Sequence, residues 1–145
     1  MAVKGKGAAF HLFGGVAPGA LVKVAEVLSI TPPAPTRDTI DTTHHDSVGD
    51  YREFISNLID AGEATVLIHY VPGSAGDDLI NEAFAAGDLR AFAIDMNSAS
   101  ATQERLAGSC LVTGYAPADV VIDDKMTATL TVKVSGPLTQ GPKPA

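Results

Sequence analysis

A strict two-residue alternation near the end of the chain restricts the fold more than any other feature. Between Met126 and Val134, every even position carries an apolar side chain and every odd position carries threonine or lysine. Successive side chains of a β-strand point to opposite faces of the sheet, so this pattern predicts a strand with one buried face. β-Branched threonine suits the polar face of such a strand. The fold must therefore contain a sheet that covers a core on one side.

Weaker alternation predicts further strands elsewhere in the chain. Glu26 interrupts the first of them, and Leu67 is the one exception to the pattern in the second. The last contains Gly108 and Gly114, which are typical of bulges or bends within a strand. The predicted strands are Ala20–Ile30, Ala64–Tyr70, Leu89–Asp95 and Glu104–Tyr115.

One segment, from Ser74 to Gly87, has helical periodicity. Ser74 followed by Asp77 resembles a capping box, and Gly87 suits the left-handed position after the last turn. The apolar stripe of this helix is predicted to consist of Leu79, Ile80, Ala83 and Phe84. Strands that surround one short helix favour a mainly β fold of the α+β type. We therefore expect an antiparallel β-sandwich or barrel with one flanking α-helix.

Length, charge and cysteine content exclude several classes of protein. A chain of 145 residues is typical of one domain, which we place at residues 1–136. The net charge of −7 argues against simple affinity for nucleic acid, which usually needs a basic patch. A single cysteine, Cys110, cannot form an internal disulfide, and its apolar neighbours indicate a small buried side chain. Without a signal peptide or an apolar span, we expect a soluble protein of a reducing compartment with no membrane partner.

A long polar stretch from Thr31 to Asp50 is the feature that a compact domain does not explain. It opens with Pro32-Pro33-Ala34-Pro35, which favours extended backbone. About 20 residues with little apolar content are generally functional or disordered. We predict a projecting hairpin or arm at about residues 31–50 that packs on another molecule, and a flexible C-terminal arm at residues 137–145. The candidate contact residues are Pro33, Arg37, Asp38, Thr39, Ile40, Asp41, His44, His45, Asp46, Tyr51, Arg52 and Phe54.

Catalytic and metal-binding interpretations of this stretch are weaker. His44, His45 and Asp46 invite a metal or acid–base hypothesis, but adjacent histidines on a strand point to opposite faces. We therefore predict no catalytic residue, no metal site and no cofactor. A small metal-dependent hydrolase that uses these three residues stays as the less favoured alternative.

Several segments together carry a family resemblance: Ile30–Ser47, Tyr51–Ile55, Leu58–Glu63, the Tyr70-x-Pro72-Gly73 turn, the helix predicted between Ser74 and Gly87, and Asp123–Gly136. They resemble the major tail tube protein of long, flexible-tailed, lambda-like bacteriophages. The likeness covers most of the chain from Lys23 to Gly136, and it is most specific in the arm and in the block that follows it. Some members of the family carry an added immunoglobulin-like domain at the C-terminus, which we expect this chain to lack.

The resemblance implies a structural virion protein with the phage tail-tube (Hcp-like) fold. Homohexameric rings would stack into the tail tube, and duplex DNA would pass through its lumen without specific binding. The arm would reach adjacent subunits and rings, with Tyr51–Ile55 anchoring its base. The other implied partners are tail terminator, tail-tip and tape-measure proteins, in a virion tail assembled in the bacterial host cytoplasm. A tube subunit of a contractile injection or secretion system is the alternative of the same fold.

Overall fold

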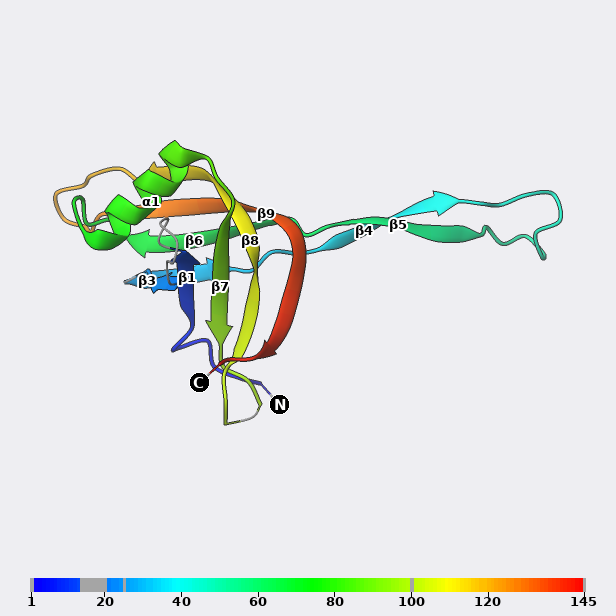
Figure 1. The fold of residues 1–145 in the computed structure, drawn as a ribbon, viewed down its shortest axis with the longest axis horizontal. Helices are drawn as coiled ribbons and strands as arrows, with labels where there is room; N and C mark the ends of the chain where they lie inside the picture. Colours follow the sequence, from blue (N-terminus) through cyan, green and yellow to red (C-terminus); the bar gives the residue numbers. More distant parts are fainter. Residues whose placement is uncertain (1, 14–20, 25, 100, 145) are drawn as a thin grey trace.

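The computed structural model describes residues 2–13, 21–24, 26–99 and 101–144, and Figure 1 shows its ribbon. These residues form nine strands and one helix. The elements are β1 (Ala9–Phe13), β2 (Leu21–Lys23), β3 (Val27–Thr31), β4 (Thr36–Asp41), β5 (Phe54–Asp60), β6 (Glu63–His69), α1 (Ala75–Ala86), β7 (Arg90–Met96), β8 (Glu104–Pro117) and β9 (Thr127–Pro142).

Seven of these strands form one antiparallel sheet in the order β2-β1-β7-β8-β9-β6-β3, while β4 and β5 pair only with each other. Strands β7 and β1 run steeply across β6 and β3 in Figure 1, because the sheet folds over on itself. The folded sheet encloses the core, and α1 lies beside it. The predicted antiparallel sandwich or barrel with one flanking helix is thus confirmed.

The alternation that predicted the strands also builds the core. Between Thr127 and Val134 of β9 the even positions are buried and the odd positions are partly exposed, as the threonine pattern requires. Phe10 and Phe92 stack at 6.3 Å between their ring centroids, and both side chains are buried. The buried residues of β6 and β9 that face this core are Ala64, Val66, Ile68, Ala128, Leu130, Val132 and Val134.

Two glycines bend the long β8–β9 ladder. The pairing register shifts between Ala107 and Ser109 and again between Val112 and Gly114, so Gly108 and Gly114 mark irregularities as predicted. A Cβ on Gly108 would lie 3.1 Å from the Pro137 carbonyl oxygen and 3.3 Å from the Phe92 ring. Only glycine lets the two strands and that ring approach so closely.

The last residues of the chain differ from the predicted flexible arm. Strand β9 continues to Pro142 and pairs with β8 as far as Glu104. β6 pairs only with the Thr127–Lys133 part of β9, so the last part of β9 is an edge. Prolines are tolerated at bulges and at edges, and here Pro137 follows the positive-φ Gly136 while Pro142 ends the strand. The prolines that suggested disorder therefore fit within an edge strand.

The helix begins and ends where its capping residues predict. The Ser74 side chain accepts a hydrogen bond from the Asp77 backbone N–H, and Gly87 adopts a left-handed φ of 64°. The Asp77 carboxylate in turn accepts a hydrogen bond from the Tyr115 hydroxyl at 3.0 Å, which ties the helix to β8. The predicted stripe is wrong at Phe84, which is 52% exposed. Leu79, Ile80 and Ala83 are enough to bury this face of a single helix.

The predicted strand Ala20–Ile30 is two strands in the structure, and its first residue lies outside the described residues. Glu26 has a φ of 59° and separates β2, which pairs with β1, from β3, which pairs with β6. The Val24 N–H donates to Phe10 and the His69 N–H donates to Glu26. The chain therefore crosses from one end of the sheet to the other at the residue that interrupts the alternation.

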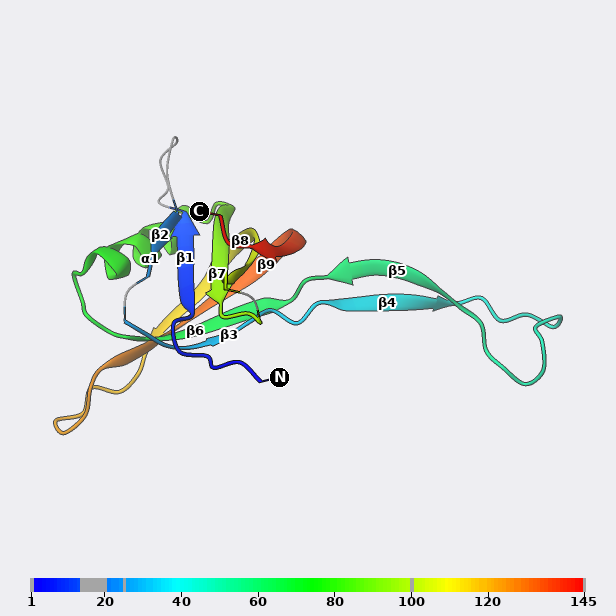
Figure 2. The same cartoon turned by 90° about the horizontal axis from the view of Figure 1, so that it is seen from below.

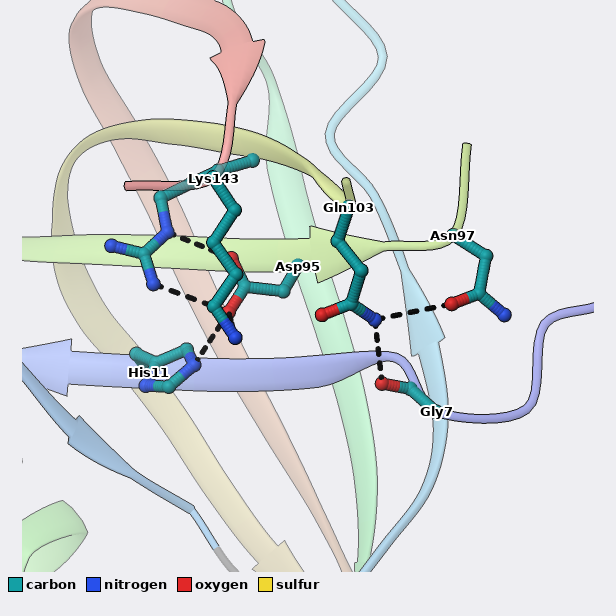
Figure 3. Close-up of polar contacts among 7 residues, drawn as sticks. Gly7, His11, Asp95, Asn97, Gln103 and Lys143 are labelled. Atoms are coloured by element: carbon teal, nitrogen blue, oxygen red, sulfur yellow. Dashed lines mark hydrogen bonds and ion pairs between the residues drawn. The ribbon is translucent and has the colours of Figure 1, made fainter. Parts of the chain in front are cut away.

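A buried carboxylate joins the first and last strands to the middle of the sheet. Asp95 on β7 is fully buried, and Figure 3 shows His11 and Lys143 beside it. His11 lies 2.9 Å, Arg105 2.7 Å and Lys143 3.5 Å from its oxygens. Burial alone raises the pKa of Asp95, but the hydrogen bonds and charges of Arg105 and His11 outweigh it, so the pKa lies below its ordinary value.

The β4–β5 hairpin leaves the body through two short connections (Figure 2). The outgoing connection contains Pro33, whose side chain is buried, and the returning one contains buried Ala61. Gly62 follows with a φ of 85°, and a Cβ at this position would lie 3.0 Å from the Ala34 carbonyl oxygen. The two connections are therefore packed so closely that glycine is needed at position 62.

Gly62→Ala should lower the free energy of unfolding by about 2–3 kcal/mol, because positive φ and the contact with Ala34 act together. Gly73→Ala is the matched control, since Gly73 has a φ of 80° but nothing lies within 4 Å of its added Cβ. That control should lose only about 1 kcal/mol. Urea denaturation of both variants measures the difference, and equal losses would show that the close approach at Gly62 is unimportant.

Asp95→Asn should lower the free energy of unfolding at pH 7 by about 2–3 kcal/mol, because it leaves Arg105 and Lys143 without their carboxylate and weakens the hydrogen bond to His11. Since the pKa of Asp95 is lowered, its stabilisation is complete above the ordinary carboxyl range near pH 4 and is lost as the pH falls through the lowered pKa. When the free energy of unfolding is measured from pH 7 to pH 2, it should therefore fall less steeply for this variant than for the wild type. The exposed control Asp123→Asn should keep the wild-type slope.

Candidate functional site

The β4–β5 hairpin, residues 36–60, is the outstanding candidate, and we call it the arm. It extends far from the body of the molecule in Figures 1 and 2. Every residue of β4 and of β5 is exposed. A two-stranded hairpin with no core of its own is marginally stable in water. The arm is therefore built for contacts that the single chain does not supply.

Both faces of the arm carry large apolar side chains. Directly paired residues share a face, so Ile40 and Ile55 lie together on one face, and Phe54 lies on the other beside Asp41. Ile59 pairs with Arg37. Between Phe54 and Ile59, β5 has one residue more than the paired part of β4, and this bulge places Ile59 on the same face as Phe54. Each of these four apolar side chains is about half exposed. A hairpin that rested on its own body would need only one apolar face.

The tip of the arm, residues 42–53, is held by hydrogen bonds within itself. The Glu53 N–H donates to the Thr43 hydroxyl at 2.8 Å, and the Ser47 hydroxyl donates to the Glu53 carboxylate at 3.0 Å. The His44 N–H donates to Ser47, and the Asp46 N–H donates to Nδ1 of His44. These bonds give the polar loop a defined shape, which is what a specific contact requires.

The arm is acidic. It contains two arginines and six carboxylates, a net charge of −4 with neutral histidines. The Thr43 hydroxyl and N–H bind the Asp41 carboxylate and lower its pKa, and the Gly62 N–H does the same for Asp60. Both groups are therefore charged at neutral pH, and a partner surface should carry positive charge.

The structure brings most of the candidate residues together on this arm. The segment Tyr51–Ile55, expected at the base, lies instead at the far end, because Phe54 pairs with Asp41 and the base is formed by Thr36 and Asp60. The expected arm at residues 31–50 thus covers only the outgoing strand and the tip. The candidate contact residues lie in four places: Pro33 in the connection at the base; Arg37, Asp38, Thr39, Ile40 and Asp41 on β4; His44, His45, Asp46, Tyr51 and Arg52 in the tip; and Phe54 at the start of β5.

The residues considered for catalysis are not assembled into a reactive site. His44 lies 3.6 Å from Glu53 on the exposed tip. Within the part of the chain that the structure describes, no three His, Cys, Asp or Glu side chains are grouped to hold a metal ion. Cys110 is fully buried in the core, and burial raises the pKa of its thiol to about 12. It packs as the small apolar side chain that its neighbours indicated.

Sequence reasoning missed a second exposed apolar group, in the loop between β8 and β9. Val120, Val121 and Ile122 are all exposed, and Ile122 completely so. This loop projects at the opposite end of the molecule from the arm in both views (Figures 1 and 2). Three consecutive apolar residues between acidic ones were the available signal. Among the described residues, no helix is both long and apolar enough to span a membrane.

Comparison with known proteins agrees with this geometry. The first similar chain comes from the virion of a native gene transfer agent particle, with a TM-score of 0.74 at 15% identity over 97% of this chain and 99% of that one. A chain of the SPP1 tail tube has a TM-score of 0.74 at 12% identity, and the match covers 98% of this chain and 80% of that one. A chain of the anti-feeding prophage baseplate has a TM-score of 0.70 at 7% identity, over 97% and 95%.

At the level of sequence, no curated protein matches this chain. A family model described as the lambda phage tail tube protein does match, over residues 4–140. That match covers the folded sheet, the helix and the whole arm. The chain belongs to the lambda phage tail tube protein family, and it is a structural protein rather than an enzyme.

Proposed function

We propose that copies of this chain form six-membered rings that stack into the tail tube through which a phage genome is delivered. The observation that carries the proposal is the arm, whose two strands are exposed along their whole length and apolar on both faces. Family membership supplies the tube as the assembly. A structurally similar chain belongs to the tail of an empty gene transfer agent particle with C6 symmetry, which supports the number six.

The two apolar faces of the arm suggest that it lies between neighbours. One face presents Ile40 and Ile55 and the other presents Phe54 and Ile59. Burying a large apolar side chain contributes about 1.5–3 kcal/mol, so covering only one face would leave much of this gain unused. An arm inserted between two other subunits satisfies both faces at once.

Strand geometry is compatible with a ring wide enough for duplex DNA. If each of six copies gives four strands to the lumen, the ring has about 24 strands. Strands spaced ~4.8 Å apart and tilted ~40° then give a circumference of roughly 150 Å. The backbone diameter is then about 48 Å, which leaves room for side chains and a duplex. Six chains of net charge −7 bring about −42 to each ring. Acidic side chains that face the lumen would let DNA slide without specific binding.

The proposal includes the partners and location of a tail tube. Tail terminator, tail-tip and tape-measure proteins would contact the ends and the lumen, in a virion tail assembled in the bacterial host cytoplasm. A contractile-system tube is the second candidate, because the anti-feeding prophage chain shares the fold. The family match favours the phage tail tube.

Electron microscopy of the purified protein tests the proposal, and six-fold annuli or tubes are expected. Ile40→Ser combined with Ile55→Ser should remove one apolar face of the arm. Each contact between an arm and its neighbour should then lose about 2–3 kcal/mol of association free energy, so the critical concentration for assembly should rise roughly a hundredfold. Circular dichroism and the thermal midpoint of the monomer should not change, because both side chains lie outside the core.

Phe84→Ser is the matched control, since Phe84 is also about half exposed but lies on the helix. It should assemble like the wild type. A wild-type protein that stays monomeric at every concentration, with its arm as accessible to protease as any loop, would contradict the proposed assembly.

A further inference from the structure

A groove of about 600 Å³ lies between the N-terminal segment, β3 and the end of β7. This volume is within the range of sites that bury several side chains or a drug-sized ligand. Its walls are mainly apolar, and Lys6 is the charged residue among those that line it. The apolar lining side chains are those of Val27, Leu28, Ile30, Pro32, Ile94 and Met96.

The N-terminal wall of this groove is held in place by two side-chain amides. Asn97 donates to the Lys4 carbonyl at 2.8 Å and to the Lys6 carbonyl at 2.7 Å. Gln103 donates to the Gly7 carbonyl at 3.2 Å and to Asn97 at 3.1 Å, as Figure 3 shows. Gly7 has a φ of 100°, a conformation that L side chains rarely adopt. The wall is thus a built feature: Lys6 lines the groove, and Lys4, two residues earlier in the same hydrogen-bonded segment, is also exposed.

The tip of the arm has the complementary chemistry. Val48 and Tyr51 are each more than 80% exposed, and they are the most exposed large apolar side chains of the tip. Asp46 and Asp50 are exposed beside them, on an arm whose net charge is −4. An apolar pair flanked by carboxylates matches an apolar groove flanked by lysines.

We propose that this groove receives the arm tip of another copy of the chain, with Val48 and Tyr51 in the apolar part and Asp46 and Asp50 beside Lys4 and Lys6. The inference rests on the proposed tube and names the receiving surface for the arm. The chain's own tip does not reach the groove, because the arm extends away from β3 and β7, which line it (Figure 2).

The contact joins two different surfaces, and this determines the kind of assembly it makes. A head-to-tail contact closes into a ring or continues as an open stack, depending on the rotation between copies. Each copy offers one tip and one groove, so within an open stack every tip has a receptor except at the ends, where one end keeps a free row of arms and the other a free row of grooves. The row of free grooves is the surface on which the next ring would be added.

Charge reversal tests the contact. Lys4→Glu with Lys6→Glu should raise the critical concentration for tube assembly by about tenfold or more, because like charges then face each other. Lys23→Glu with Lys125→Glu is the matched control, since it changes the net charge equally at two exposed lysines outside the groove. Adding Asp46→Lys and Asp50→Lys to the groove variant should restore assembly to within about threefold of the wild type.

The outcomes separate this inference from the proposed tube. If the wild type forms tubes and the groove variant assembles like its control, the groove is not the receptor while the tube stands. If the groove variant fails and the reversed arm does not rescue it, the groove binds a different surface and the arm assignment is wrong. If the wild type forms no rings or tubes, the proposed function itself fails.

Disulfide trapping gives a second readout that does not depend on charge. A mixture of Leu28→Cys and Val48→Cys chains should form interchain disulfides on assembly, whereas Leu28→Cys mixed with Val120→Cys should not. Val120 is as exposed as Val48 to a first approximation but lies in the opposite loop, and native Cys110 is buried and does not compete. Equal trapping in the two mixtures would overturn the proposed contact.

Discussion

The β8–β9 ladder is the interaction on which the rest of the structure depends. On one side β8 pairs with β7, which pairs with β1, and on the other side β9 pairs with β6, which pairs with β3. The β8–β9 pairing therefore connects the two halves of the folded sheet. Its register shifts at Gly108 and Gly114 let one pair of strands take part in both halves. A Cβ at position 108 would lie 3.3 Å from the Phe92 ring, so the absence of a side chain at the bend leaves room for this ring in the core. Ladder pairing, bending and core packing are thus one constraint.

The arm follows from that constraint and is not an appendage added to it. It leaves the sheet from β3 and returns into β6, which are adjacent antiparallel strands, so its two connections start side by side. Pro33 and Ala61 are buried at this point and Gly62 allows the close approach to Ala34. Beyond them no residue of β4 or β5 is buried. The body therefore determines where the arm starts, and only neighbours can bury its length.

The sequence predicted most of the buried strands, the helix and the outgoing half of the exposed arm, but it missed other exposed segments. Alternation predicted β6 and the first half of β9, and capping residues predicted α1 to within a residue, because both signals arise from burial and backbone chemistry inside the chain. β5 reads Phe-Ile-Ser-Asn-Leu-Ile-Asp, with apolar side chains on both faces and no alternation. β1, only five residues long, was also missed. Exposed residues show no periodicity set by the core of their own chain, so the return strand of the arm and the apolar loop at Val120–Ile122 were not identified.

An exposed two-stranded arm also has two free edges, and unpaired edges promote indiscriminate strand addition. Here β4 carries Arg37, Asp38 and Asp41, and β5 has an extra residue that interrupts its ladder. Charges and bulges on an edge are the usual protections against such pairing. Their effect is selective, because an acidic edge that repels its own copies is still attracted to a surface with lysines at its rim. The carboxylates of β4 would keep free chains apart, and Asp46 and Asp50 in the tip of the same acidic arm would direct it to the groove beside Lys4 and Lys6. Solubility before assembly and specificity during assembly would then both depend on the negative charge of the arm.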